Sequence, residues 1–347
     1  MSLLQQLQYN DYKKAKAFTL EQCVTIASLT KLEISFNNVD NPGEHLLEEL
    51  HRNGFTKSNY EALLLSLQRY RPQAKIAILI ANDKYIHLSK LATPSTDCDS
   101  LGSNLKLLGF IVVTIKNTTA HDLKVILRNI SDVIPADSYC FMFYAGHGCQ
   151  LCNTKCMLGI DCPTENVEVE HCVTENYALK VLEGCQLDMC ILIMDMCRVP
   201  LDREANPSIY LSMTDVEDYM IHNNLLICYS TQSSKGAYEM VQMEFSTMNG
   251  NSTYQLQTGD SKRILSGMSV YVNALCTRFE DSTDISSLLD RVHADVERLL
   301  EKQRPIKLQC GTDKRYLYDA TIGDTTTFLQ TPWKEATKSY KEHCIVY

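Results

Sequence analysis

Two reactive side chains follow runs of apolar residues in this sequence. His147 comes after the run Tyr139–Tyr144, and Cys197 comes directly after the run Met189–Met196. A free thiol has a pKa of about 8.5, and a neighbouring imidazole can take its proton to leave a nucleophilic thiolate. Glycines on both sides of His147 would let a substrate backbone approach, and the N–H groups of Gly148 and Cys197 could hold an oxyanion. The pair predicts thiol catalysis; a packed thiol beside a solvent-facing histidine is the alternative.

The elements around this pair are predicted from the hydrophobic pattern. Short apolar runs alternate with helical spacings from residue 75 onward, which is typical of a mostly parallel α/β sheet with helices on both faces. The expected strands cover 76–81, 110–115, 139–144, 189–196, 225–230 and 306–310, and the expected helices cover 101–108, 123–134, 178–182, 268–278 and 285–301. Because ligand sites in such sheets lie beyond the carboxyl ends of the strands, His147 and Cys197 are expected to face each other there.

The composition narrows the class of protein. The 347 residues include 33 basic and 42 acidic side chains, and the net charge of −9 argues against nucleic-acid binding. No apolar run approaches the roughly 18 residues that a membrane-spanning helix needs, so no membrane partner is expected. Fifteen cysteines and a polar start without a secretory signal pattern favour reduced thiols in the cytoplasm, with the nucleus as a second compartment.

Four segments carry a resemblance to a known family: AILIAN at 77–82, YAGHG at 144–148, MLGIDCP at 157–163 and LIMDMCR at 192–198. They resemble the paracaspases, caspase-like cysteine proteases of metazoan lymphocyte signalling, and the likeness covers roughly residues 75–324. His147 lies 50 residues before Cys197, a separation also typical of caspases. The signature Gln-Ala-Cys-x-Gly of the Asp-cleaving caspases is absent. The resemblance implies His147 as general base, Cys197 as nucleophile, and cleavage after Arg.

An acidic pocket agrees with the implied preference for arginine. The planar guanidinium of arginine needs carboxylates placed to receive it. Asp195 lies two residues before Cys197, so strand alternation puts both side chains on one face. The resemblance implies Asp97 and Glu239 as further carboxylates of the pocket for the residue before the cleaved bond, called S1. A helix N-cap is the alternative role for Asp97.

A group of cysteines crowds the segment after His147: Cys149, Cys152, Cys156, Cys162 and Cys172. The first two have the spacing of a zinc-binding Cys-x2-Cys pair, but no second pair of this kind follows, and a structural zinc needs four ligands. We expect loop thiols and no metal, with a zinc site as the alternative.

The first 70 residues read as helical, and Arg71-Pro72 closes the segment because a proline resists continuing a helix. The segments 44–55 and 62–70 resemble the last helices of death and death-effector domains. This likeness implies death-fold adaptor proteins as partners. The alternative is a helical cap on the protease.

The last part of the chain carries two further expectations. Residues 325–347 form a polar tail that resembles the family's link into a following immunoglobulin-like domain, and the immunoglobulin-like domains usual in the family are expected to be absent here. Trp333 is either a regulatory contact in the family's manner or an exposed tail residue. The strand 306–310 resembles the edge strand through which caspase-like domains pair, which implies a homodimer.

The sequence thus predicts a caspase-like α/β domain at 71–324, preceded by a small all-α, death-fold-like module at 1–70. The expected activity is that of a cysteine endopeptidase that cleaves protein substrates after Arg, in immune or cell-death signalling, without a cofactor. The alternative is a non-catalytic signalling scaffold on the same fold. A nucleotide-binding domain is disfavoured, since no Gly-x-Gly-x-x-Gly or Walker loop follows the strand 76–81.

Overall fold

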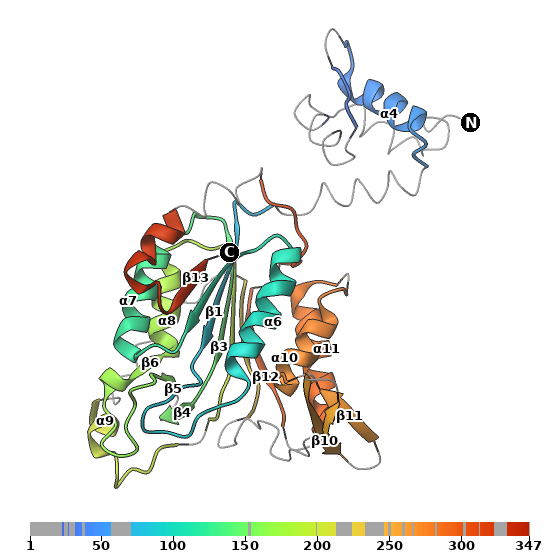
Figure 1. Cartoon of the computed structure of the whole chain (residues 1–347). Coiled ribbons are helices and arrows are strands. Elements are labelled where there is room, and N and C mark those ends of the chain that lie inside the picture. The colour runs from blue at the N-terminus through green and yellow to red at the C-terminus, as the bar shows by residue number, and fades with distance from the viewer. Residues whose placement is uncertain are drawn as a thin grey trace. The chain divides into compact units, whose positions relative to one another are not determined.

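The structure, a computed structural model, divides the chain into two compact units, Met1–Tyr70 and Arg71–Tyr347 (Figure 1). It describes residues 23, 27, 32–36, 39–56, 71–151, 154–198, 200–212, 224–232, 246–248, 251–258, 261–265, 267–281, 283–300, 303–311, 313–322 and 332–346. For residues 246–248, 251–258 and 261–265 it describes the backbone alone.

In the first unit the structure describes the helix α4 (Pro42–Arg52). The Asn41 side chain caps this helix by accepting a hydrogen bond from the Glu44 N–H at 2.9 Å, and proline occupies the first turn, where its missing N–H is harmless. Leu46, Leu47 and Leu50 are buried on one face. A helix is therefore found where the sequence indicated one, while most of the predicted death-fold-like module lies outside the described residues and stays a prediction.

The second unit is built on a seven-stranded sheet in the order β12-β8-β7-β3-β1-β2-β13. The strands are β1 (Lys75–Ala81), β2 (Ile111–Lys116), β3 (Tyr139–Ala145), β7 (Met189–Asp195), β8 (Leu225–Tyr229), β12 (Ile306–Cys310) and β13 (Cys344–Val346). The five inner strands are parallel, and the two edge strands β12 and β13 run antiparallel to their neighbours. The prediction of a mostly parallel sheet is confirmed.

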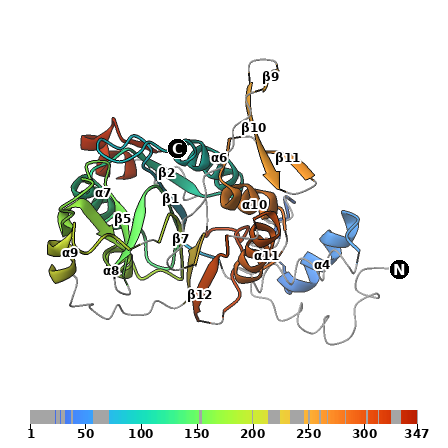
Figure 2. The same ribbon diagram turned by 90° about the horizontal axis from the view of Figure 1, so that it is seen from below.

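Helices cover both faces of this sheet (Figures 1 and 2). On one face lie α6 (Pro94–Leu107), α10 (Val270–Arg278) and α11 (Ile285–Leu299), and on the other lie α7 (Ala120–Ser131) and α8 (Glu175–Glu183). Four of these helices begin after a side chain that accepts a hydrogen bond from the first turn: Thr119, Thr174, Ser269 and Asp284. Because both faces are covered, β1 and β3 are buried at every residue and read as continuous apolar runs.

The remaining elements connect or extend this core. A small antiparallel sheet of β4 (Gly148–Leu151), β5 (Thr154–Leu158) and β6 (Cys172–Thr174) follows β3 directly, where the sequence indicated a loop. The others are η1 (Val169–His171), α9 (Pro207–Ser212), the antiparallel strands β9 (Ser246–Met248), β10 (Asn251–Thr258) and β11 (Ser261–Leu265), and η2 (Lys338–Tyr340). No helix among the residues described here combines the length and apolarity that crossing a membrane requires.

The last described segment packs against the sheet. Residues 332–336 form a helical turn, and β13 pairs with β2, with Cys344 opposite Ile115. Trp333 has no exposed surface, and its indole N–H donates a hydrogen bond to the Val133 carbonyl at 3.4 Å. The alternative in which Trp333 is an exposed tail residue is therefore wrong. The segment is locally polar, so its contact with α7 and the sheet gives no periodic signal along the chain.

We expect Trp333→Ala to destabilise the second unit by about 3–5 kcal/mol, because the substitution removes a large, fully buried side chain and leaves a cavity. The measurement is urea unfolding followed by circular dichroism. Leu107→Ala is the control: its side chain is 87% exposed, and we expect a change of about 0.5 kcal/mol or less. A Trp333 variant as stable as this control would contradict the packing of the segment.

Candidate active site

The pairing of β3 with β7 places His147 and Cys197 side by side in sequence register, beyond the carboxyl ends of these two inner strands. The strands are parallel and in register, with Ala145 opposite Asp195, and each reactive residue comes two positions after its strand ends. Both residues line one pocket of about 430 Å³, which Asp97 and Asp195 also line. Four of the residues predicted from the sequence therefore share one pocket. Glu239, the third carboxylate expected there, lies outside the described residues.

The imidazole of His147 is held by a loop that follows β1. Its Nε2 lies 2.7 Å from the Ser89 carbonyl oxygen and 3.3 Å from the Ser89 hydroxyl, and its ring centroid lies 4.5 Å from that of Tyr85. A carbonyl oxygen can only accept, so we assign the ring proton to Nε2, which leaves the lone pair of Nδ1 free to take a proton. Sequence reasoning missed Ser89, because any residue type can supply a main-chain carbonyl.

The glycines beside His147 are required by packing. A Cβ at Gly148 would lie 2.2 Å from the Met196 sulfur and 3.0 Å from the Cys156 carbonyl oxygen. Gly148 also opens β4, where it pairs with Met157. The sequence had indicated room for a substrate backbone as the reason for these glycines, and the structure adds contact with the loop that carries Cys197. The role of the Gly148 N–H toward an oxyanion stays a prediction.

The two acids of the pocket are bridged by one serine. Asp97 lies in the first turn of α6 and is fully buried, and Asp195 ends β7. The Ser269 N–H donates to Oδ1 of Asp97 at 2.8 Å, and its hydroxyl donates to Oδ2 of Asp195 at 2.7 Å. The N-cap position of α6 is Thr93, so the alternative role of Asp97 as an N-cap is wrong. Ser269 was missed because it falls inside the expected helix 268–278, whereas the observed helix α10 begins at Val270 and has Ser269 as its N-cap.

Burial governs the charge of this pair. It raises the pKa of Asp97 well above the ordinary value of a carboxyl, and the nearby Asp195 raises it further. Burial also raises the pKa of Asp195, against the hydrogen bond from Ser269. Among the described residues Oδ2 of Asp97 has no hydrogen-bond partner. The pocket thus holds two carboxyl groups that a cation entering it would stabilise.

A buried network fixes the residue after Cys197. Arg198 is 5% exposed, and its guanidinium lies 4.2 Å from the ring centroid of Tyr229. The ammonium of Lys155 lies 4.9 Å from the same centroid and 3.5 Å from Glu175, which accepts a 2.8 Å hydrogen bond from the Tyr229 hydroxyl. Cations near an aromatic ring are attracted to its face. The network therefore anchors the chain directly behind the thiol.

Among the described cysteines that follow His147 in the sequence, Cys149, Cys156 and Cys172 lie on the strands of the small sheet, and Cys162 lies in a connecting segment. Cys149, Cys156, Cys162 and Cys172 are buried around the small sheet, and Cys152 lies outside the described residues. Cys149 lies opposite Cys156, whose thiol forms hydrogen bonds with both Cys149 and Cys172. Within the described part of the chain, no three His, Cys, Asp or Glu side chains are arranged to hold a metal ion. These thiols pack as small apolar side chains.

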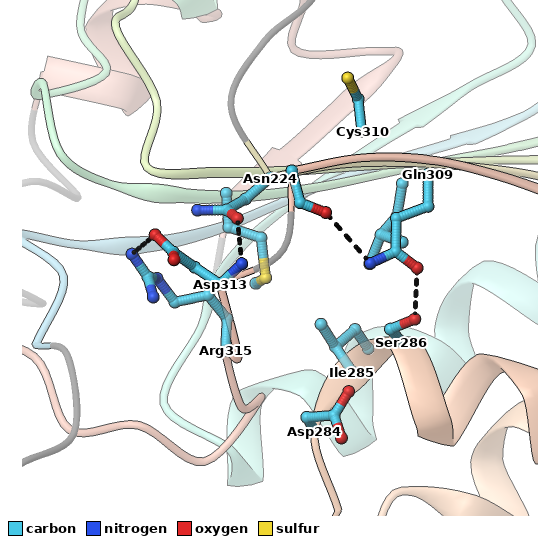
Figure 3. A pocket seen from close by; sticks show the side chains of 11 residues that line it. Asn224, Asp284, Ile285, Ser286, Gln309, Cys310, Asp313 and Arg315 are labelled. Carbon is cyan, nitrogen blue, oxygen red and sulfur yellow. Dashed lines mark hydrogen bonds and ion pairs between the residues drawn. The ribbon is translucent and has the colours of Figure 1, made fainter.

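A second pocket lies at the opposite ends of the strands, where β7 and β8 begin (Figure 3). Its polar groups contact one another. The Ser286 hydroxyl donates to the Gln309 amide oxygen at 2.6 Å, the Asn224 amide oxygen accepts from the Asp313 N–H at 3.2 Å, and Arg315 lies 3.3 Å from the Asp313 carboxylate. This pocket contains none of the predicted site residues, so the chemistry is argued from the first one.

The comparisons with known proteins agree with this fold. Residues 74–336 match the model of the caspase domain, a family of cysteine proteases, and the chain belongs to that family. It is 24% identical to human mucosa-associated lymphoid tissue lymphoma translocation protein 1 over 210 residues. This aligned region covers 60% of this chain and 24% of the human protein. The mouse homolog is 23% identical over 298 residues, or 84% of this chain and 32% of that protein.

These similarities make the chain a paracaspase-like member of the caspase family, as its motifs predicted. It spans about a quarter to a third of the length of the curated relatives it matches.

The raised pKa of Asp97 predicts a pH dependence of stability. The folded state holds this proton more tightly than the unfolded state, so the free energy of unfolding falls as pH rises above the ordinary carboxyl pKa of about 3.9. We therefore expect Asp97→Asn, which removes the charge, to be more stable than wild type at neutral pH. The difference should shrink as pH falls toward that ordinary pKa, as measured by urea unfolding.

Asp99→Asn on the same helix is the matched control. Asp99 is exposed and forms an ion pair with Lys116 at 2.7 Å, so this variant should not exceed wild type in stability at neutral pH. Equal stabilities of wild type and Asp97→Asn at every pH would contradict the prediction.

Proposed function

We propose that this protein is a cysteine endopeptidase that cleaves protein substrates after arginine, with Cys197 as the nucleophile and His147 as the general base. One observation carries the proposal: a single pocket is lined by a thiol, an imidazole and two carboxyl groups that share one serine. Asp97 and Asp195 would bind the arginine of the substrate. Glu239 is a third carboxylate proposed for the same pocket.

The chemistry follows from the orientation of His147. With Nε2 committed to the Ser89 carbonyl, Nδ1 takes the proton of the Cys197 thiol. The thiolate attacks the scissile carbonyl, and the N–H groups of Gly148 and Cys197 stabilise the oxyanion. His147 then gives its proton to the departing amine, and a water that loses a proton to His147 hydrolyses the thioester. Each step uses only groups of this chain, the substrate and a water molecule, so the proposal includes no cofactor.

The preference for arginine follows from the buried acids. Burial raises the pKa of both carboxyl groups. A cation that binds beside them stabilises their charged form strongly, because little water is present to screen the attraction. A guanidinium is planar and always charged, so it can meet both carboxylates at once. An aspartate at the same position of the substrate would be repelled. The acidic pocket therefore supports cleavage after Arg rather than after Asp.

The cellular setting is proposed from the resemblance and the sheet edge. β12 closes one edge of the sheet and pairs with β8 on a single side, which supports a homodimer through β12. Death-fold adaptors remain the proposed partners of residues 1–70, in immune or cell-death signalling. Fifteen cysteines favour a reducing compartment, and we place the protein in the cytoplasm, with the nucleus as a second site.

Turnover of fluorogenic peptides tests the proposed function. We expect a peptide that ends in Arg to be cleaved at least about 10³-fold faster than one that ends in Asp. Cys197→Ala should lower this activity by at least about 10³-fold, because it removes the nucleophile. Cys276→Ala is the control, since Cys276 is a partly exposed thiol that does not line the pocket. Faster cleavage of the Asp peptide would refute the assignment, and an inactive wild-type dimer would favour the scaffold.

Ser269 gives a sharper test of the arginine pocket. Ser269→Ala removes the hydroxyl that holds Asp195, and we expect a loss of about tenfold in kcat/KM for the Arg peptide. The variant also loses the N-cap of α10, where the hydroxyl accepts from the Val272 N–H at 3.2 Å. Ser269→Thr keeps a hydroxyl and should restore most of the activity. If Ser269→Ala retains full activity, the serine hydroxyl does not position Asp195 for the substrate.

A further inference from the structure

The hydroxyl groups of two buried tyrosines contact the backbone of His147. The His147 N–H donates to the Tyr85 hydroxyl oxygen at 2.7 Å, and the Tyr144 hydroxyl donates to the His147 carbonyl oxygen at 2.7 Å. The two hydroxyl oxygens lie 3.2 Å apart. Both tyrosines are almost fully buried, at 2% and 0% exposed. The peptide groups on both sides of the His147 Cα are therefore held by side chains from outside its own loop.

These hydrogen bonds form a closed ring that starts at the His147 N–H and returns to the His147 carbonyl, and we call this ring the circuit. Each phenol has one proton, so the Tyr85 hydroxyl, which accepts from His147, can donate to Tyr144, and Tyr144 can donate to the His147 carbonyl. The Leu158 carbonyl oxygen is a second, more distant acceptor, at 3.3 Å from the Tyr85 hydroxyl and 3.0 Å from the Tyr144 hydroxyl, whereas the Tyr144 hydroxyl lies 2.7 Å from the His147 carbonyl oxygen. Burial raises the pKa of both tyrosines, so the hydroxyls keep their protons. Hydrogen bonds in such chains strengthen one another.

We propose that Tyr85 and Tyr144 are positioning residues that hold His147 in the geometry needed to deprotonate Cys197, an inference that rests on the proposed function. Tyr144 belongs to β3 and fixes the backbone from the sheet, while Tyr85 comes from the loop after β1. The Tyr85 ring also packs on the imidazole, with centroids 4.5 Å apart. With Nε2 held at the Ser89 carbonyl, both the backbone and the ring of His147 are fixed.

Gly146 supplies an independent sign of this circuit. A Cβ at this position would lie 2.6 Å from the Tyr144 hydroxyl oxygen and 2.7 Å from the Tyr85 hydroxyl oxygen. The φ of Gly146 does not lie in the left-handed region, so the glycine is needed for the space that the two hydroxyls occupy. A methyl group here would separate the hydroxyls while leaving both tyrosines in the chain.

Tyrosine-to-phenylalanine substitutions test the circuit. We expect Tyr85→Phe and Tyr144→Phe each to lower kcat for the Arg peptide by about tenfold or more, because small displacements of a catalytic group are costly. KM should stay within about twofold, since neither residue lines the pocket. The double variant should be little slower than the slower single variant, because either substitution opens the same circuit.

Tyr139→Phe is the matched control. Tyr139 lies at the other end of β3, is equally buried, and donates a 2.8 Å hydrogen bond to Asp319 away from His147. It should keep kcat within about twofold of wild type when rates are normalised to folded protein. The proposal is overturned if the two variants keep kcat as well as Tyr139→Phe does, or if the effects of the two substitutions multiply in the double variant.

Gly146→Ala should lower kcat as the double variant does. Gly184→Ala is its control, because a Cβ at Gly184 would meet only the Val181 carbonyl oxygen at 3.7 Å, an ordinary contact. A Gly146→Ala enzyme with the kcat of the Gly184 variant would overturn the proposal.

A readout without substrate separates this proposal from the proposed function. The rate of Cys197 alkylation by iodoacetamide is followed against pH by mass spectrometry, with His147→Ala as the reference for a thiol that lacks its base. We expect Tyr85→Phe and Tyr144→Phe to move toward that reference and Tyr139→Phe to follow wild type. If wild type cleaves no Arg peptide, the proposed function fails, and the alkylation rates alone then decide whether the two tyrosines position His147. Alkylation of both tyrosine variants at the wild-type rate would overturn the positioning role.

Discussion

The parallel register between β3 and β7 is the constraint on which the site depends. Ala145 lies opposite Asp195, so the two strands end together and the chain needs two further residues to reach either His147 or Cys197. A shift of one residue in a strand turns every side chain to the other face. All of β3 and nearly all of β7 are buried, so such a shift would cost much of the core. The packing of the sheet therefore sets the positions of the two chain segments that carry the thiol and the imidazole.

The same register places the carboxyl group of Asp195 where burial disfavours its charged form. Asp195 is the last residue of β7, and Asp97 approaches it from α6, so two carboxyl groups share a space that raises the pKa of both. Ser269 satisfies one oxygen of each acid, and Oδ2 of Asp97 has no partner among the described residues. Sites of function often retain such unfavourable groups because the ligand completes them. The arginine of the proposed substrate would bring a positive charge and a planar set of N–H donors, which the two carboxyl groups need as partners.

Local patterns predicted most of the sheet and part of the site. The inner strands are apolar runs covered on both faces, and each was placed within two residues of its observed bounds, with His147 and Cys197 at the ends of two of them. Long-range contacts left no local signal. Trp333 sits in a polar segment whose partners, Asn129 of α7 and Val133 just after that helix, lie far away in the sequence, and Ser89 acts through a main-chain carbonyl. The small sheet was missed because its many cysteines looked like candidate ligands rather than strand residues.

The loops that carry His147 and Cys197 also constrain each other directly. Met196, between Asp195 and Cys197, lies so close to Gly148 that a Cβ there would come within 2.2 Å of the Met196 sulfur. Gly148 in turn begins β4, which is fixed by its pairing with β5. The small sheet thus holds one side of this contact while β7 holds the other. The residues next to the imidazole and next to the thiol are thus each held by a paired strand and by packing against each other.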